Sequence, residues 1–487
     1  MRGVVAAGHP LTAEAGADVL RAGGNAVDAA LGAMLTSFVT EPLLTGLGAG
    51  GFMLVAAPDR DDVLLDFFVA APSDGERAPL VPVSVSFGDA VQVFNIGAAS
   101  CGAYGNPAGV HAASERYGSI PLAELCAPAA ALARKGVEVN RQQAYLFEIL
   151  APITEHTAES RALYMPDGRP HALGEVHRDP TLADALELLG AEGPAPFYEG
   201  EIAAAVVEWV QERGGTLSRT DLAAYAAIPR EPVRVAYRGR EVLTNPPPSA
   251  GGTLLGYALA LLERGGDGPP DAIELARAME RAQSERTPSF LDGLAEPGFL
   301  ESFMASRLGS TTHISVVDDT GWACAATCTN GEGSGIVVPG TGVHVNNMMG
   351  EQDLSPLGFF THPPGRRLPS MMAPTIVLAD GLPELVLGSA GSNRIRSALL
   401  QVIVNAIDRG MDAQAAVEAP RMHWEDGSVF TEPGIDVAAL EAAGYVIAPF
   451  RERNLFFGGC QAVERAADGT LSGGGDPRRG GAVALVT

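Results

Sequence analysis

The sequence predicts an α+β protein in which two β-sheets lie between layers of helices. Strand patterns and helix patterns are mixed at both ends of the chain, which suits two sheets with helical layers outside them. The length of 487 residues suits one large unit or two interwoven domains with a sizeable core. A hydrophobic content of 46% and 59 Gly fit a compact, loop-rich globular protein and exclude a disordered one.

Two capped helices are expected near the N-terminus. Residues 12–22 have a helical pattern, with Thr12 as the N-cap and Gly23-Gly24 as the stop. Asn25 caps the next helix, and Asp28 lies in its first turn, where a carboxylate interacts favourably with the helix dipole.

The glycine-rich run from Gly46 to Gly51 matches the dinucleotide-binding pattern GxGxxG. It precedes a predicted strand, residues 52–56, whereas a pyrophosphate site needs these glycines between a strand and a helix. The pattern therefore stands in the wrong context, and nucleotide binding is not expected here.

Along the rest of the chain, helices dominate first and strands later. Residues 110–150 and 180–265 are expected to be mostly helical, and residues 285–310 form an irregular segment that contains Pro and Gly. Strands are expected to dominate over 311–376, and a long helix over 393–407. There is no internal repeat and no low-complexity tract.

The most informative stretch is a predicted β-hairpin that ends in two threonines. Residues 309–318 have the pattern of a loop followed by a strand, and residues 322–329 have that of a second strand. The linking Asp319-Thr320-Gly321 suits a three-residue hairpin loop with Gly in the left-handed position. With that loop, Thr311 faces Thr329, and two hydroxyl groups meet at the open end of the hairpin.

Thr311 is a candidate N-terminal nucleophile. If the chain is cleaved between Ser310 and Thr311, the threonine hydroxyl attacks the substrate and its own freed α-amine serves as the base. A small residue before the threonine and strand geometry after it suit this role. The alternative is ordinary sheet surface, because Thr is common in strands, and spacing alone leaves both open.

Charge and cysteine content limit which binding partners and which cellular location we expect. The formal net charge of −25 disfavours binding to nucleic acid or to anionic membranes and suits solubility or a salty cytosol. Five Cys without a CxxC pair indicate reduced, mostly buried thiols. The chain has no signal-peptide pattern and no uncharged apolar run of about 18 residues, and its nine His show no metal-ligand spacing. We therefore expect a cytoplasmic protein without a membrane span or a metal.

The segment from Thr311 to Asp318 (TTHISVVD) resembles the start of the small subunit of γ-glutamyltransferases, which are self-cleaving N-terminal-nucleophile hydrolases. Six further motifs resemble family segments in the same order: Gly23–Ala30, Pro246–Gly252, Asn346-Asn347, Ser370–Thr375, Gly388–Ser392 and Asp476–Arg478. The resemblance covers nearly the whole chain. It implies a four-layer αββα sandwich of the N-terminal-nucleophile hydrolase type, built from a large-subunit segment, 1–310, and a small-subunit segment, 311–487.

The resemblance assigns catalytic roles to four residues: Thr311, Thr329, Gly391 and Ser392. Thr311 is the nucleophile, released by cleavage after Ser310, and Thr329 hydrogen-bonds and positions it. The N–H groups of Gly391 and Ser392 form the oxyanion hole, since N–H groups at a helix N-terminus stabilise negative charge. From the sequence alone, this segment also suits an ordinary connection between a strand over 384–387 and a helix.

The resemblance also implies an acyl-donor site lined by six residues: Phe68, Asn330, Met348, Glu351, Ser370 and Met371. Asn330 corresponds to an asparagine that holds the donor, and Glu351 to the acid that binds its α-amine. Ser370 corresponds to the first of two serines that bind its α-carboxylate.

This donor site departs from the family pattern toward apolar residues. Phe68 stands where the family has an arginine that binds the α-carboxylate, and losing a bidentate partner is not a conservative change. Met348 and Met371 also replace polar family residues. Arg366 or Arg367 is the alternative source of a compensating charge, and the family's lid over the site is shorter here.

We therefore expect a self-processing amide hydrolase or acyltransferase that works through an acyl-enzyme. Its substrate is a γ-glutamyl compound such as glutathione, or a related amide, and its acceptor is water or an amine. One alternative is a homologue that acts on a non-glutamyl acyl group, as a small-amide or C–C bond hydrolase. Another is an unprocessed pseudo-enzyme that binds a metabolite. The expected assembly is two subunits from one chain, with a homodimer of these left open, and no cofactor is implied.

Overall fold

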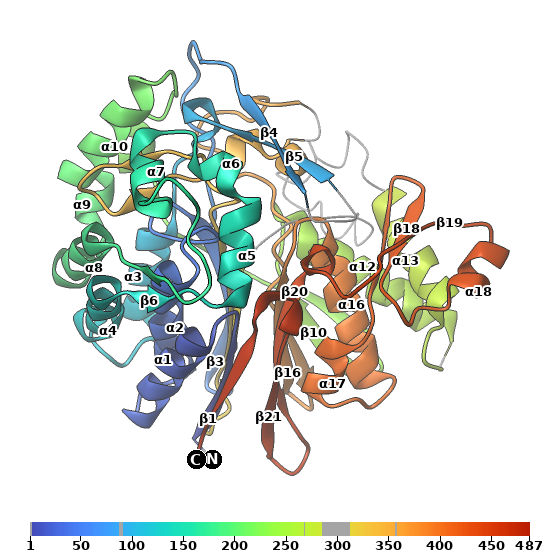
Figure 1. Ribbon diagram of the computed structural model, residues 1–487. Helices are drawn as coiled ribbons and strands as arrows, with labels where there is room; N and C mark the ends of the chain where they lie inside the picture. Colours follow the sequence, from blue (N-terminus) through green and yellow to red (C-terminus); the bar gives the residue numbers. More distant parts are fainter. Residues whose placement is uncertain (1, 87–90, 267, 285–311, 356–357) are drawn as a thin grey trace.

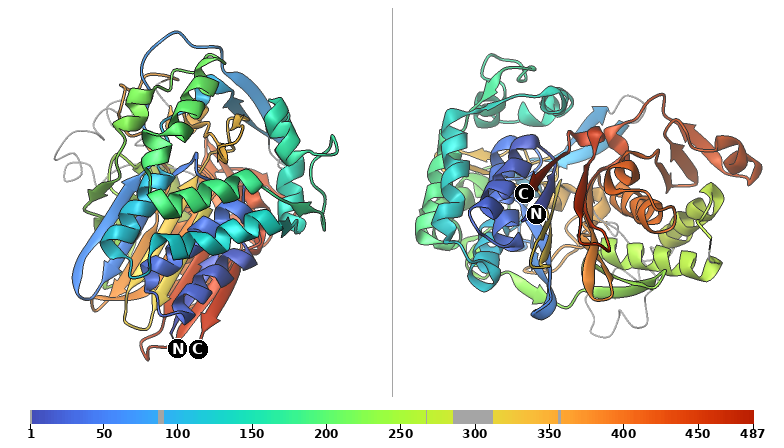
Figure 2. Two further views of the ribbon diagram at one scale, coloured as in Figure 1. Left: turned by 90° about the vertical axis from the view of Figure 1, so that its left-hand side faces the viewer. Right: turned by 90° about the horizontal axis from the view of Figure 1, so that it is seen from below.

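The computed structural model describes residues 2–86, 91–266, 268–284, 312–355 and 358–487. Figure 1 shows two sheets stacked face to face with helices on both outer sides, and the view from below in Figure 2 shows the same layers in cross-section. The predicted four-layer αββα architecture is therefore confirmed.

One sheet has seven strands and contains the first and last strands of the chain. In order across the sheet, these are β22 (Ala482–Val486), β1 (Gly3–Ala7), β11 (Thr312–Asp318), β12 (Ala323–Thr329), β2 (Gly50–Ala57), β3 (Arg60–Phe67) and β8 (Ile228–Arg230). Strand β1 pairs antiparallel with both β11 and β22, so the two ends of the chain lie side by side (Figure 1). Strand β11 therefore lies inside the sheet, where its backbone is fixed on both sides.

The other sheet has six strands. In order, these are β21 (Leu471–Gly475), β20 (Gly459–Arg465), β16 (Leu382–Ala390), β15 (Thr375–Ala379), β10 (Arg240–Thr244) and β9 (Val233–Tyr237). Strand β16 is paired on both sides, by β15 and β20, and runs into helix α16 (Arg394–Ile407). The long helix that the sequence predicts over 393–407 is thereby confirmed.

Helices cover the outer face of each sheet. The seven-stranded sheet carries α1 (Pro10–Arg21), α2 (Ala26–Thr40) and α3 (Asn106–Tyr117), with α4 (Leu122–Lys135) and α8 (Pro180–Glu192) outside them. Further helices on this side of the molecule are α5 (Arg141–Ile149), α6 (Ala151–Thr154), α7 (Ala158–Tyr164), α9 (Ala195–Tyr198), α10 (Glu201–Gln211) and α11 (Arg219–Ala223). The other side carries α12 (Ala250–Gly265), α13 (Ala272–Ser284), α16, α17 (Ala413–Glu418) and α18 (Val437–Ala442). None of the described helices is both long and apolar enough to cross a membrane.

Short elements complete the fold. The small sheets pair β4 (Val81–Ser86) with β5 (Val91–Ile96), β6 (Val137–Glu138) with β7 (Val176–His177), β13 (Val337–Val338) with β14 (Val343–His344), and β17 (Met422–Glu425) with β18 (Ser428–Thr431) and β19 (Val446–Pro449). The 3-10 helices are η1 (Ala98–Ser100), η2 (Met348–Gly350), η3 (Gln352–Leu354), η4 (Leu455–Phe457) and η5 (Pro477–Arg479). Residues 180–265 are mostly helical, as expected, and only β8, β9 and β10 interrupt the helices. Alternate residues of β9 (Val233, Val235 and Tyr237) are buried with the two-residue period of a strand.

One capping prediction is confirmed and the other is wrong. Asn25 caps α2 and Asp28 lies in its first turn, as predicted, and the two residues also form a capping box. Helix α1 begins at Pro10, however, and its N-cap is His9, whose ring nitrogen accepts a hydrogen bond from the Leu11 N–H at 3.1 Å. Thr12 instead lies inside the helix and hydrogen-bonds to Thr40 of α2 at 2.7 Å, a distant partner that no local pattern reveals.

The two sheets meet through alternate residues of β11. Ile314 and Val316 pack into the apolar core beneath the helices, whereas Val317 packs into the core between the sheets. His313 also points between the sheets, where its ring nitrogens lie 2.7 Å from the Thr327 hydroxyl and 2.8 Å from the Ser315 hydroxyl. Burial lowers the pKa of His313 to about 3, so the ring stays neutral and serves as a structural bridge.

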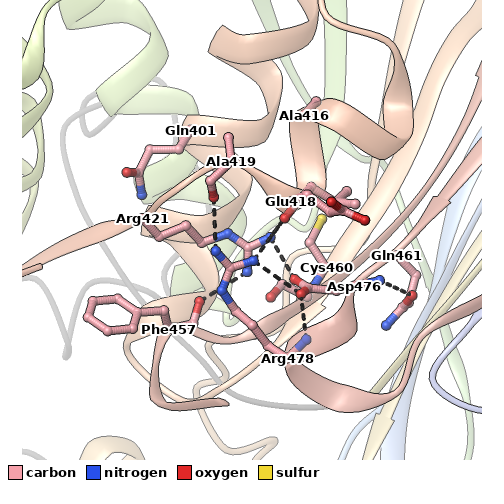
Figure 3. Close-up of polar contacts among 12 residues, drawn as sticks. Gln401, Ala416, Glu418, Ala419, Arg421, Phe457, Cys460, Gln461, Asp476 and Arg478 are labelled. Carbon is pink, nitrogen blue, oxygen red and sulfur yellow. Dashed lines mark hydrogen bonds and ion pairs between the residues drawn. The ribbon is translucent and has the colours of Figure 1, made fainter. Parts of the chain in front are cut away.

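A buried ion-pair network ties the C-terminal segment to β20 and to the turn at Phe457 (Figure 3). The carboxylate of Asp476, which is fully buried, lies 2.7 Å from Arg421 and 3.1 Å from Arg478. Asp476 also accepts a hydrogen bond from the Cys460 N–H at 2.9 Å, and Arg421 donates to the Phe457 carbonyl at 3.2 Å. Asp476 and Arg478, which the sequence motif contains, therefore form an ion pair that is part of a larger network.

Replacing Asp476 with Asn is expected to destabilise the fold by roughly 3–5 kcal/mol, because two buried arginines would lose their carboxylate. Burial alone would raise the pKa of Asp476, but Arg421 and Arg478 outweigh it and lower the pKa. The contribution of Asp476 is therefore fully present above the usual pKa of Asp and lost as the pH falls toward the lowered value. Urea unfolding at pH 7 measures the effect. The control is Asp468→Asn, an exposed acid of the same C-terminal region. Equal unfolding free energies for Asp476→Asn and the wild type would contradict this expectation.

Candidate active site

The β11–β12 hairpin has the predicted register. Its strands pair from Thr312 opposite Cys328 to Val317 opposite Ala323, around the predicted loop of residues 319–321. The predicted cleavage site and nucleophile lie outside the described residues: Ser310 and Thr311. The described part of the hairpin thus ends one residue short of the predicted nucleophile.

Thr329 lies at the end of β12 and is buried. By the alternation of a strand it shares a face with Thr327, which meets His313 between the sheets. The Thr329 hydroxyl accepts a hydrogen bond from the Gly331 N–H at 2.8 Å. Thr329 is therefore held at the end of the strand, on the side that faces the second sheet.

The predicted oxyanion residues form a tight turn between β16 and α16. Gly391 has a φ of 122° and Ser392 a φ of 53°, both in the left-handed region. A Cβ at Gly391 would lie 2.7 Å from the Cα of Gly458, so Gly is required here for space as well as for conformation. The conformation of this turn thus depends on its packing against Gly458 as well as on its own sequence.

Thr329, Gly391 and Ser392 line one pocket. Thr329 ends a strand of the seven-stranded sheet, and Gly391 and Ser392 follow β16 of the six-stranded sheet. The fold thus brings them together, as the sequence predicts. The rest of the wall combines aliphatic and charged residues that sequence reasoning did not select: Leu44, Leu146, Ile149, Leu150, Gly331, Glu332, Arg394, Leu455 and Arg479.

The apolar residues of the predicted donor site separate into two cores. Phe68 and Met348 belong to the core between the sheets, where the Phe68 ring stacks on Phe52 with centroids 5.4 Å apart. Met371 instead packs into the core beneath the six-stranded sheet. Met371 thus packs into a different core from Phe68 and Met348, and also from its neighbour Met372.

Two polar residues of the predicted donor site, Asn330 and Glu351, lie beside Gly331. Glu351 accepts a hydrogen bond from the Asn347 amide at 3.1 Å. A Cβ at Gly331, where φ is 66°, would lie 2.0 Å from the Asn347 side chain and 2.9 Å from Glu351, so Gly allows this close approach. The adjacent Asn330 is fully buried, and neither polar atom of its side chain has a hydrogen-bond partner within the described part of the chain. Such an amide is costly to bury unless a ligand satisfies it.

Ser370 is buried and held by the segment before helix α12. Its carbonyl accepts a hydrogen bond from the Ser249 hydroxyl at 2.9 Å, and its own hydroxyl accepts one from the Met372 N–H at 3.1 Å. The hydroxyl thus stabilises a local turn.

Arg367 was a candidate to replace the charge of the family arginine, but its guanidinium is held by other residues. Its guanidinium stacks on Tyr225 with the carbon 4.1 Å from the ring centroid and lies 3.4 Å from the carboxylate of Asp66. It also donates to the Ala226 carbonyl. These three contacts fix the side chain, so Arg367 is not a replacement for the arginine that Phe68 displaces.

Glu41 is a buried acid beside β11 that sequence reasoning missed. Its carboxylate accepts a hydrogen bond from the Thr312 hydroxyl at 3.0 Å. Burial raises the pKa of Glu41 to about 7, and the Thr312 hydroxyl and Arg479 oppose the rise. The only local signal was an acid directly after a mostly apolar helix, where burial depends on the partner strand.

The stability of the protein is expected to fall as the pH rises from about 4.5 to about 7, in part because Glu41 must ionise in a buried site. Glu41→Gln keeps the site neutral and should remove about 3 kcal/mol of that fall. Urea unfolding at pH 4.5 and pH 8 measures it, with the exposed Glu14→Gln as the control. A Glu41→Gln protein with the pH dependence of the wild type would show that Glu41 does not titrate in this range.

Known proteins similar to this chain are enzymes. The sequence model described as Gamma-glutamyltranspeptidase matches residues 12–301 and 275–486. The Glutathione hydrolase proenzyme of Escherichia coli (strain K12) is 33% identical, over 98% of this chain and 90% of its own length. The Acylase ACY 1 proenzyme of Pseudomonas sp. (strain SE83) is 33% identical, over 97% of this chain and 91% of its own length.

A solved structure agrees with these sequence matches. The cephalosporin acylase from Bacillus halodurans superposes with a TM-score of 0.85 and 28% identity, over 99% of this chain and 95% of its own. The sequence matches span nearly the whole chain and include the hairpin and the turn that meet at the pocket. The chain belongs to the gamma-glutamyltranspeptidase family.

Proposed function

We propose that this chain is a self-processing amide hydrolase or acyltransferase whose nucleophile is Thr311, released by cleavage after Ser310. The proposal rests on one observation: the end of the β11–β12 hairpin and the turn after β16 meet at the same pocket. If the β11–β12 register continued by one residue, position 311 would pair with Thr329, which lines the same pocket as Gly391 and Ser392. A nucleophile at 311 would therefore face both its positioning threonine and its oxyanion donors.

The chemistry of these groups is acyl transfer. The Thr311 hydroxyl attacks the amide carbonyl, and the freed α-amine of the same residue takes the proton. The N–H groups of Gly391 and Ser392 stabilise the oxyanion, and loss of the amine leaves an acyl-enzyme. Water or an amine then attacks the acyl-enzyme and releases the acyl group.

We propose further that the preferred acyl group lacks the α-carboxylate of a γ-glutamyl group. Asn330 and Glu351 supply hydrogen-bonding groups for a polar end of the acyl chain. Phe68 is apolar and packs on Phe52, so it supplies no charge for a carboxylate, and Arg367 is held by Asp66. Relatives named as glutathione hydrolase and as acylase are equally similar to this chain, so the family accommodates both kinds of donor.

Cleavage at 310/311 would yield two segments that stay together. The segment 1–310 contributes β1, which lies between β11 and β22 of the segment 311–487. It also contributes β10, which pairs with β15 of the other segment. We therefore propose a processed enzyme in which both segments build each sheet.

The purified wild type is expected to separate into fragments 1–310 and 311–487 on a denaturing gel, with masses that match cleavage before Thr311. Thr311→Ala should remain one chain because the attacking hydroxyl is gone. Thr329→Ala should slow cleavage, since a lost hydrogen bond costs about 0.5–1.5 kcal/mol. The exposed Thr361→Ala is the control. A wild type that stays full length through weeks of incubation would refute self-processing.

The second expectation concerns the acyl group. The wild type should hydrolyse a 4-aminobutanoyl anilide, which lacks the α-carboxylate, better than the γ-glutamyl anilide. Phe68→Arg should raise kcat/KM for the γ-glutamyl anilide by about 10- to 100-fold, the value of a charged, bidentate hydrogen bond. Val93→Arg, at an exposed position, controls for added charge. Efficient γ-glutamyl turnover that Phe68→Arg leaves unchanged would place a carboxylate-binding group elsewhere.

A further inference from the structure

We infer that Glu425 is a positioning residue for the turn formed by Gly391 and Ser392 (the oxyanion turn), and that it acts through the side chain of Asn393. The inference rests on the proposed function, because this turn stabilises an oxyanion only if the chain transfers acyl groups. Glu425 is not among the residues that line the pocket, and no step of the proposed reaction uses it.

The oxyanion turn depends on support from both sides. Ser392 has a φ of 53°, in the left-handed region, which is unfavourable for a residue with a Cβ. Before the turn, β16 is paired with β20 as far as Ala390, which lies opposite Gly459. After the turn, Asn393 is the cap residue of α16, but its side chain makes no capping hydrogen bond in that helix. The contact that this side chain makes instead therefore bears on the conformation of the turn.

Asn393 is held by Glu425, at the end of β17. The amide of Asn393 donates a hydrogen bond to one carboxylate oxygen of Glu425. The other carboxylate oxygen lies 3.4 Å from Nε2 of His423, which is two residues earlier and therefore on the same face of the strand. Nδ1 of His423 lies 2.8 Å from the hydroxyl of Ser397, one turn after Asn393 on α16. The strand thus grips the first turn of α16 at two places.

Burial and charge determine where the protons lie in this chain of contacts. Burial lowers the pKa of His423, so its ring is neutral at pH 7. Burial alone would raise the pKa of Glu425. The hydrogen bond with His423 and the charges of Arg394 and Arg396 outweigh burial and lower that pKa. Because a carboxylate only accepts, Nε2 of His423 carries the proton and Nδ1 accepts from the hydroxyl of Ser397. Each hydrogen bond therefore donates toward Glu425.

The surroundings of Glu425 favour a rigid contact. Asn393 and His423 are buried, and the Glu425 side chain is only 21% exposed. The rings of Phe430 and Phe456 each have their centroid 6.4 Å from that of His423, and they restrict its movement. A hydrogen bond to an ionised acceptor is strong where water is largely excluded. Loss of the carboxylate should therefore release the side chain of Asn393 and loosen the turn beside it.

Hydrogen–deuterium exchange measures the turn directly and needs no turnover. The N–H groups of Arg394 and Ile395 donate to the two carbonyls of the oxyanion turn at 3.1 and 3.0 Å, so their exchange reports on its opening. In Glu425→Ala, exchange at these two N–H groups should be about 10-fold faster or more. Asp426→Asn, at the exposed acid next in the chain, should exchange as the wild type does.

The kinetic test exchanges the two partners. In Asn393→Asp, two carboxylates face each other. For the 4-aminobutanoyl anilide, kcat per processed chain should fall by about 10- to 100-fold with little change in KM, since misplaced N–H groups weaken binding of the transition state alone. Adding Glu425→Gln restores one amide and one carboxylate with their roles reversed. The double variant should recover most of the lost rate, which a general loss of structure would not allow.

The outcomes separate this inference from the proposed function. If the wild type hydrolyses no amide, the proposed function fails, and the exchange measurement alone decides whether Glu425 positions the turn. If amides are hydrolysed, the inference is overturned when Glu425→Ala leaves exchange unchanged, or when the double variant is no faster than Asn393→Asp. The proposed function stands in both of those cases.

Discussion

The packing of one sheet against the other at the His313 ring sets the geometry of the site. A Cβ at Gly388 would lie 2.2 Å from this ring, so the strand of one sheet touches the strand of the other directly. Strand β11 ends beside the predicted nucleophile, and β16 ends at the turn containing Gly391. The two halves of the site belong to different sheets. Their relative position therefore depends on this contact and on the network around Asp476, which holds the Phe457 turn behind Gly391.

Local signals predicted the parts of this protein that local chemistry determines. The loop 319–321 fixed the hairpin register because a three-residue turn allows few alternatives, and the register then placed Thr329. The glycine-rich end of β16 likewise indicated a strand-to-helix turn. The order of the motifs supplied the rest of the architecture, since no single helix or strand pattern specifies two stacked sheets.

The errors and omissions share one physical cause, which is a partner far away in sequence. Thr12 has the side chain of an N-cap, but Thr40 takes its hydroxyl and His9 begins the helix. Glu41 and Arg479 have ordinary sequence surroundings, and only the folded chain buries them beside the site. The residues that were missed are those that no resemblance singled out.

The pairing of β1 with β22 has a consequence for how the proposed N-terminal threonine nucleophile can be produced. Gly3 lies opposite Val486, so a short peptide could join the two ends of the chain without disturbing either sheet. The order of the chain could then be permuted, with translation starting at Thr311 and segment 1–310 following residue 487. Removal of the initiator methionine alone would expose the threonine amine. In such a protein the catalytic N-terminus would arise by synthesis, and autoproteolysis would be separated from catalysis.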